Sequence, residues 1–228
     1  MGIPVLLLGE SGSGKSTSMR NFLPDEIGIF NVASKPLPFR TKLPCANGAD
    51  YGMIKKALKH PKINCYVIDD SQALMAFAMF SRVKEKGYDK FTEIAVDFYD
   101  LLQFIIKDTP PDCIVYFMHH TETSDSGKIK AKTVGKMLDN QLTVEGLFSI
   151  VLLAQTDGMR HWFATQSDGF NTAKSPMDMF QREIDNDLKV VDSTIREYWG
   201  LAGAAKNAEN AGENKPENNP EKKELENA

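Results

Sequence analysis

Residues 3–16 read I-P-V-L-L-L-G-E-S-G-S-G-K-S. The unbroken apolar run at residues 3–8 predicts a strand that is buried on both faces of a parallel sheet. Residues 9–16 fit the phosphate-binding-loop pattern of two glycines, a lysine and a hydroxyl residue at fixed spacing. Residues 16–22 predict a helix, which Pro24 ends. A strand, a glycine-rich loop and a helix in this order favour phosphate binding over an ordinary glycine-serine turn.

The residue types in this loop are suited to holding the phosphates of a nucleotide such as ATP. Glycine lets the backbone take conformations that are closed to other residues, so that successive N–H groups turn toward phosphate oxygens. The Lys15 side chain places a positive charge near the terminal phosphates, and the Ser16 hydroxyl is a ligand for Mg²⁺. The predicted nucleotide-binding residues are Gly9, Glu10, Ser11, Gly12, Ser13, Gly14, Lys15, Ser16 and Thr17.

The composition is that of a single-domain protein without a strong overall charge. The chain has 228 residues, 42% of them hydrophobic, and a formal net charge of −4 with a pI of about 5.6. Because no overall positive field attracts nucleic acid or a membrane, any DNA binding has to come from local loops. The three cysteines lack the spacing of disulfide frameworks or zinc sites, and no apolar stretch reaches the length of a membrane span. We therefore expect a cytoplasmic protein without membrane contact.

Apolar runs and amphipathic segments alternate along the rest of the chain. Strands are predicted at residues 27–32, 63–70, 113–118, 147–154 and 159–165, and helices at residues 50–60, 71–86 and 90–107. Residues 33–45 and 119–132 are predicted to be loops, and the Asp-Gly pairs at residues 157–158 and 168–169 predict hairpins. The alternation predicts an α/β fold, with a mostly parallel sheet, helices on both faces and antiparallel hairpins at one edge.

Residues 201–228 differ in composition from the rest of the chain. They contain no aromatic residue, many Asn, Glu and Lys residues, and two prolines. A segment of this kind does not bury enough apolar surface to offset the entropy that folding removes. We therefore expect residues 1–200 to form the folded core and residues 201–228 to be a disordered polar tail.

Two acidic residues, Asp69 and Asp70, end the strand predicted at residues 63–70. In doubly wound sheets, ligands bind at the carboxyl ends of the parallel strands, where the phosphate loop also lies. Asp69 is therefore the candidate that holds Mg²⁺, together with Ser16, and Asp70 is the candidate that polarises the attacking water. The structural alternative is a carboxylate that caps the following helix. Both roles are compatible, because one acid can cap while the other serves the metal.

His119 and His120 follow the strand predicted at residues 113–118 and reach the same edge of the sheet. A polar side chain in this place can sense the terminal phosphate or orient water. We assign this candidate catalytic role to His120, in addition to Lys15 and Asp70. The alternative is a histidine that only makes hydrogen bonds at the end of a strand.

The segment after these histidines concentrates lysines in an otherwise acidic chain. Lys128, Lys130, Lys132 and Lys136 lie within nine residues, and the first three alternate, so that an extended backbone presents them on one side. Two functional interpretations compete: the loop binds the backbone of a nucleic acid, or its lysines reach the nucleotide of a neighbouring subunit. The structural alternative is a solvated lysine loop.

The phosphate loop resembles that of RecA, which also carries a Glu-Ser pair early in the loop. The match is closer to the small phage-encoded RecA-core ATPases that are linked to single-strand annealing and recombination. Besides the loop, this resemblance is carried by residues 69–70, 132–139, 142–148 and 173–176. It covers most of residues 3–199.

This resemblance implies a RecA-like P-loop NTPase fold, with residues 1–200 as the ATPase core. It also implies binding and hydrolysis of ATP with Mg²⁺, a homo-oligomer in the form of a ring or filament, and action on single-stranded DNA. A single-strand-binding protein would be a further partner, and the host cytoplasm would be the location. In RecA-type assemblies, paired lysines of one subunit reach the ATP of the next. Lys130 with Lys132, or Lys132 with Lys136, are the candidates here.

One feature departs from the RecA pattern. RecA-like proteins carry a catalytic glutamate after a strand that follows the phosphate loop, whereas residues 33–36 read A-S-K-P. Either Asp70 takes this role, Glu10 contributes, or hydrolysis is slow. Two other functions stay open: a small-molecule kinase with the same loop, and a nucleotide-gated DNA clamp with little hydrolysis. Such kinases usually close an arginine-bearing lid, and the arginines of this chain do not cluster.

Overall fold

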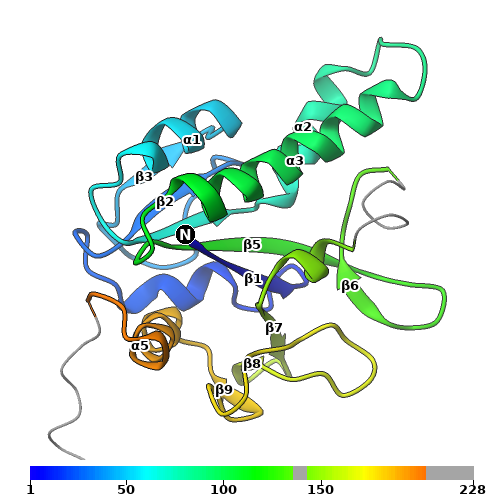
Figure 1. Cartoon of the computed structure of the whole chain (residues 1–228). Helices are drawn as coiled ribbons and strands as arrows, with labels where there is room; N and C mark the ends of the chain where they lie inside the picture. The colour runs from blue at the N-terminus through cyan, green and yellow to red at the C-terminus, as the bar shows by residue number, and fades with distance from the viewer. Residues whose placement is uncertain (136–142, 204–228) are drawn as a thin grey trace, which may run out of the picture.

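The computed structural model describes residues 1–135 and 143–203, in which a single sheet forms the centre of the molecule (Figure 1). Lys136 and most of the predicted tail therefore lie outside the described residues. The helices and strands, in chain order, are β1 (Ile3–Gly9), η1 (Ser16–Asn21), β2 (Gly28–Asn31), β3 (Cys45–Asn47), α1 (Tyr51–Lys59), β4 (Cys65–Asp69), α2 (Gln72–Ser81), α3 (Asp89–Asp108), β5 (Ile114–Thr123), β6 (Ile129–Ala131), η2 (Val144–Leu147), β7 (Ile150–Thr156), β8 (His161–Ala164), β9 (Glu183–Asp185) and α5 (Leu188–Trp199).

The sheet of the described residues has nine strands, most of them parallel. Strands β3, β2, β4, β5, β1 and β7 lie next to one another in this order, and each pair of neighbours is parallel. Strands β8 and β9 extend the sheet beyond β7 in antiparallel orientation, and β6 pairs antiparallel with β5. These pairings confirm the predicted α/β fold with a mostly parallel sheet and an antiparallel edge.

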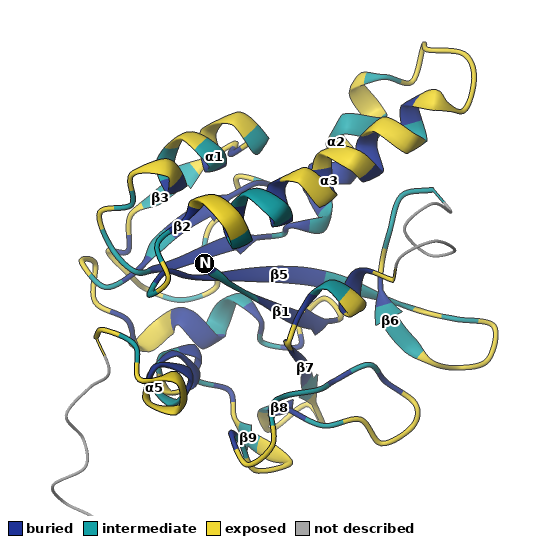
Figure 2. Cartoon of the chain, in the orientation of Figure 1, coloured by how far each residue is buried: buried dark blue, intermediate teal, exposed yellow. Residues whose placement is uncertain are grey.

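Helices cover both faces of this sheet, as predicted (Figure 1). Side chains of β1 alternate between the two faces, because successive residues of a strand point to opposite sides. Leu6 and Leu8 belong to the core under α1, α2 and α3, whereas Val5 and Leu7 belong to the core under η1 and α5. These four side chains are at most 1% exposed, and Figure 2 shows the buried strands at the centre of the molecule. The phosphate loop therefore begins at the end of a rigid, fully buried strand.

The segment predicted as a polar loop at residues 119–132 is instead a β-hairpin. Strand β5 continues to Thr123 and pairs with β6, with Thr121 opposite Ala131 and Thr123 opposite Ile129. The physical reason is that β6 buries the alternate side chains: Ala131 is 1% exposed, and its N–H donates to the carboxylate of Glu145. The prediction of a loop was wrong because pairing with β6 continues β5 through this polar segment, in which His119 is fully buried.

Three helices also differ from the predictions. The helix after the phosphate loop, η1, is a 3₁₀ helix. Helix α2 ends at Ser81 instead of residue 86, and the Lys90 ammonium group donates to the carbonyl oxygens of Arg82 and Glu85 in the turn that follows. Helix α5 was not predicted; the Asp187 carboxylate caps its start and Gly200 ends it with a left-handed conformation at φ 62°.

Two further features of the described residues concern the cysteines and the helices. The three cysteines are free thiols, of which Cys65 and Cys113 are buried. In residues 1–135 and 143–203, none of the helices combines the length and the apolar character that a membrane span requires.

Candidate functional site

The phosphate loop connects the end of β1 at Gly9 to the start of η1 at Ser16. Gly12 and Gly14 have φ angles of 82° and 93°, which side-chain-bearing residues rarely adopt. A Cβ atom on Gly9 would lie 2.4 Å from the Ser13 hydroxyl oxygen, so that only glycine fits there. The loop thus has the tight backbone curvature that phosphate binding by N–H groups requires.

Lys15 lies inside this loop with 7% of its surface exposed. Its ammonium group donates to the carbonyl oxygens of Gly9 at 2.7 Å and Glu10 at 2.8 Å. Burial lowers the pKa of Lys15 to about 8, against the opposing effect of the nearby Asp70 and Asp69 carboxylates. Near neutral pH the side chain is therefore mostly a cation, and its partners in the loop are uncharged.

The side chains of Ser16 and Asp69 are in hydrogen-bond contact, although β5 lies between β4 and β1 in the sheet. Asp69 is the last residue of β4, and β5 lies between β4 and the phosphate-loop strand β1. The Ser16 hydroxyl donates to Asp69 Oδ1 at 2.8 Å. Burial raises the pKa of Asp69, and the hydrogen bond from Ser16 opposes that rise. The predicted pair of metal ligands is thus in direct contact.

This pair fits Mg²⁺ in the way proteins usually hold that ion. The described residues contain no group of three or more His, Cys, Asp or Glu side chains that would hold a metal without help. Mg²⁺ at nucleotide sites typically takes one or two protein oxygens and completes its shell with water and substrate phosphates. Ser16 and Asp69 provide one hydroxyl and one carboxylate at the edge of the phosphate loop.

Asp70 contacts two side chains that line the same cavity, Lys35 and His120. Its carboxylate lies 2.7 Å from the Lys35 ammonium nitrogen and 3.2 Å from His120 Nε2. The hydrogen bond with His120, followed by that with Lys35, lowers the pKa of Asp70 to about 2 despite partial burial. Asp70 also has a φ of 57°, a left-handed conformation that is uncommon outside glycine. The alternative of a helix cap is not observed for α2, whose cap is Ser71 without a side-chain hydrogen bond in the described structure.

The two neighbouring histidines have different surroundings because they point to opposite faces of β5. His120 contacts Asp70 in the cavity. His119 is fully buried, with Nδ1 2.9 Å from the Ser71 hydroxyl and Nε2 donating to the Lys132 carbonyl oxygen at 2.8 Å. Burial lowers the pKa of His119 to about 4. Only His120 is therefore placed for the role predicted for this pair.

One cavity of about 260 Å³ brings most of the predicted site residues together. Its lining residues are Ser11, Gly12, Gly14, Lys15, Ser16, Thr17, Lys35, Pro36, Pro38, Asp69, Asp70 and His120. Glu10 and Ser13, which were also predicted, line a neighbouring cavity of about 200 Å³ between the loop and the ends of β5 and β7. The site therefore has the phosphate loop on one side and the Lys35, Asp70 and His120 cluster on the other.

Sequence reasoning missed three side chains near the loop. Lys35 lies in the segment predicted to be a loop at residues 33–45, and its ammonium group contacts Asp70. His161 and Asn186 come from the antiparallel edge and pack against the loop: a Cβ atom on Gly14 would lie 3.0 Å from His161 Nδ1 and 3.1 Å from Asn186 Nδ2. His161 Nδ1 also donates to the Ser13 carbonyl oxygen at 3.1 Å. No local pattern indicates these two contacts, because they depend on the pairing of β8 and β9.

The lysine-rich segment lies on the β5–β6 hairpin, next to the cavity in the chain. Lys128 and Lys132 are exposed, whereas Lys130 is partly buried and its ammonium group lies 3.0 Å from the Glu122 carboxylate. The Lys132 N–H donates to the carbonyl oxygen of His120 at 2.9 Å. The hairpin is thus connected by backbone hydrogen bonds to a residue of the cavity, and Lys136 lies outside the described residues.

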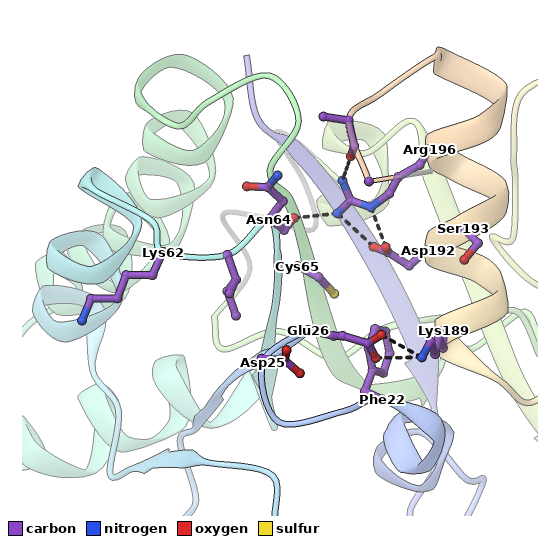
Figure 3. Close-up of a pocket in the computed structure, with 13 residues that line it drawn as sticks. Phe22, Asp25, Glu26, Lys62, Asn64, Cys65, Lys189, Asp192, Ser193 and Arg196 are labelled. Atoms are coloured by element: carbon purple, nitrogen blue, oxygen red, sulfur yellow. Dashed lines mark hydrogen bonds and ion pairs between the residues drawn. The ribbon is translucent and has the colours of Figure 1, made fainter. Parts of the chain in front are cut away.

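A separate cavity of about 310 Å³ lies at the opposite edge of the sheet, where β4 begins (Figure 3). Four of its charged side chains, Glu26, Lys189, Asp192 and Arg196, have partners inside the protein. Arg196 of α5 is 3% exposed and bonds to the Asp192 carboxylate and to the carbonyl oxygen of Asn64, while Lys189 bonds to Glu26 (Figure 3). These contacts attach α5 to the sheet, and we assign this cavity a structural role.

Comparison of the chain with models of known protein families finds no match, and a search of curated proteins finds none either. The functional argument therefore depends on the cavity itself. The chain is an α/β domain with a mostly parallel sheet, a phosphate-loop sequence at the carboxyl end of a central strand, and two acidic residues at the end of a strand nearby.

Proposed function

We propose that this chain binds ATP with Mg²⁺ and hydrolyses it as a RecA-like ATPase that acts on single-stranded DNA. The observation that carries the proposal is the meeting of Lys15, Ser16 and Asp69 at one cavity around left-handed glycines. A buried lysine supplies charge for the phosphates, and a hydroxyl-carboxylate pair supplies ligands for the metal ion that accompanies them.

In this proposal the loop holds the phosphate groups through its N–H groups, and Lys15 strengthens that contact. Phosphate oxygens would replace the carbonyl groups of Gly9 and Glu10 as acceptors for the Lys15 ammonium group, because hydrogen bonds between charged groups are stronger than those to neutral carbonyls. Mg²⁺, held by Ser16 and Asp69, would neutralise part of the phosphate charge.

We assign Asp70 and His120, which line the same cavity, to the attacking water. With a pKa of about 2, the Asp70 carboxylate is a weak proton acceptor, so that its role is to orient water rather than to remove a proton. His120 is held by the same carboxylate at 3.2 Å. This restrained arrangement also favours the second candidate function, a nucleotide-gated clamp in which binding matters more than hydrolysis.

We place the contact with single-stranded DNA at the β5–β6 hairpin. Lys128, Lys130 and Lys132 lie on a hairpin that begins in the same strand as His120. A connection of this kind supports coupling between DNA and the nucleotide site. The ring or filament, a trans-acting lysine, a single-strand-binding partner and a cytoplasmic location follow from the resemblance and form part of the proposal.

The proposal is tested by nucleotide binding and phosphate release with and without single-stranded DNA. The wild-type chain is expected to bind ATP with Mg²⁺ and to release phosphate faster when DNA is present. Lys15→Ala is expected to weaken ATP binding by about tenfold or more, because it removes a charge-assisted contact. Normal turnover by Lys15→Ala would contradict the assignment of the loop. Turnover that depends on a small-molecule acceptor instead of DNA would favour the kinase.

A further inference from the structure

Lys35 occupies a rigid position on the side of the cavity that faces the phosphate loop. Its backbone is held by the buried Asn31, whose side-chain oxygen accepts from the Lys35 N–H at 3.2 Å and whose side-chain nitrogen donates to the Lys35 carbonyl oxygen at 2.7 Å. The preceding residue, Ser34, has a φ of 55°, a conformation that costs free energy in a residue with a side chain. The backbone is thus fixed in an unfavourable conformation that aims Lys35 at the cavity.

The Lys35 side chain itself is free to exchange partners. It is 66% exposed, and its ammonium group contacts the Asp70 carboxylate at 2.7 Å. Asp70 has a second neighbour, His120, whose Nε2 lies 3.2 Å from the carboxylate, so that the carboxylate keeps one partner when Lys35 leaves. An exposed ion pair of this kind contributes little stability, and a stronger anion can therefore displace it.

The terminal phosphate of a nucleoside triphosphate is such an anion. Lys15 and Lys35 line the same cavity, with Lys15 in the loop and Lys35 on the segment after β2. A terminal phosphate between them carries more charge than the Asp70 carboxylate and offers more acceptor oxygens. Without Lys35, the same phosphate would face Asp70 with less positive charge nearby. A diphosphate lacks that group and leaves the Lys35–Asp70 contact in place.

We propose that Lys35 distinguishes nucleoside triphosphate from diphosphate, by moving from Asp70 to the terminal phosphate while Asp70 stays bound to His120. This inference rests on the proposed nucleotide site. Release of Asp70 from Lys35 would also leave one carboxylate oxygen accessible to water only when a triphosphate is bound.

The test is equilibrium binding of a non-hydrolysable ATP analogue and of ADP, each with Mg²⁺, to the full chain. Lys35→Ala is expected to weaken binding of the ATP analogue by about tenfold and binding of ADP by less than twofold, because only the analogue has a third phosphate. Lys35→Arg is expected to keep part of the preference for the ATP analogue over ADP. The matched control is Lys42→Ala, an exposed lysine in the same segment that does not line the cavity.

A second variant separates contact with phosphate from simple neutralisation of Asp70. If Lys35 only screens Asp70, the double variant Lys35→Ala with Asp70→Asn regains the wild-type preference for the ATP analogue, which overturns the inference. If Lys35 binds the phosphate, the double variant shows no such recovery. If Lys35→Ala weakens binding of both ligands equally, that result also overturns the inference. A wild-type chain that binds neither ligand overturns the proposed function and this inference together.

Discussion

Asp69 and Asp70 are neighbours in sequence, but their carboxylates have opposite electrostatic surroundings. Burial at the end of β4 raises the pKa of Asp69, whose oxygen accepts from Ser16. Hydrogen bonds with His120 and Lys35 lower the pKa of Asp70, which is more open to the cavity. The buried Asp69 carboxylate beside Ser16 suits a metal ligand, and the Asp70 carboxylate, held by two side chains at the cavity, suits a water-orienting group.

His119 is expected to make the stability of the protein depend on pH. Its pKa is about 4 in the folded protein and near 6.5 in an unfolded chain, so that the unfolded chain binds more protons between these values. The contribution of the neutral His119 side chain to stability is therefore fully present above pH 6.5 and is lost as the pH decreases toward 4. Between pH 7.5 and pH 5, the free energy of unfolding is expected to decrease by about 2 kcal/mol. Urea unfolding at these two pH values measures it.

The variant His119→Gln assigns this pH dependence to one residue. It is expected to be less stable at pH 7.5, because it loses contacts to Ser71 and Lys132, but to show a smaller decrease between the two pH values. His60→Gln is the control, since His60 is exposed at the end of α1. A His119→Gln variant with the full wild-type decrease would show that other groups titrate in this range.

Among the elements, α5 shows how a helix that was not predicted becomes part of the fold. Its apolar residues Leu188, Val191 and Ile195 are fully buried against one face of the sheet. Arg196 extends from the same helix to the edge where β4 begins (Figure 3). The helix therefore closes the face that η1, a short 3₁₀ helix, leaves partly uncovered.

Arg196→Ala is expected to lower the free energy of unfolding by about 3 kcal/mol, because it leaves the Asp192 carboxylate buried without its partner. Lys189→Ala on the same helix is the matched control. The Lys189–Glu26 pair is more than one-third exposed on both sides, so its loss is expected to cost less than about 1 kcal/mol. Chemical denaturation measures the free energy of unfolding of the two variants and of the wild-type chain. Equal losses would mean that Arg196 acts through general packing.

At the scale of the whole molecule, β5 connects the two regions to which function is assigned. Its residue His120 lies in the cavity, and its outer end forms the hairpin with the lysines. His119, on the other face of the strand, ties the hairpin to the core through the Lys132 carbonyl oxygen. The hairpin and the cavity are therefore joined by one continuous strand and its hydrogen bonds.

Replacement of Lys128, Lys130 and Lys132 by alanine is expected to weaken binding of single-stranded DNA. If all three contact phosphates, the slope of log affinity against log salt decreases in magnitude by about 2. Fluorescence anisotropy at several salt concentrations measures both quantities. A variant with Lys42→Ala, Lys56→Ala and Lys59→Ala, three exposed lysines outside the hairpin, controls for net charge. Unchanged affinity, slope and DNA-stimulated turnover in the triple variant would remove this role from the hairpin.

Much of the architecture was predictable because local patterns encode it. The apolar run of β1, the amphipathic spacing of α3 and the Asp-Gly turn between β7 and β8 are each contained within a few residues. The hairpin at residues 119–132 and the early end of α2 were predicted wrongly. In both cases the deciding contacts come from outside the segment concerned: Glu145 contacts β6, and Lys90 contacts the turn after α2.

The amino-acid sequence by itself determined a phosphate loop between a buried strand and a helix, and an acidic pair at the end of a second strand. Only the tertiary structure decided which side chains meet there. Ser16 contacts Asp69 across β5, and Lys35 contacts Asp70 although 35 residues separate them. The physical reason is that residue identity and spacing act along the chain, whereas strand order and register decide which residues from different elements lie within hydrogen-bond distance.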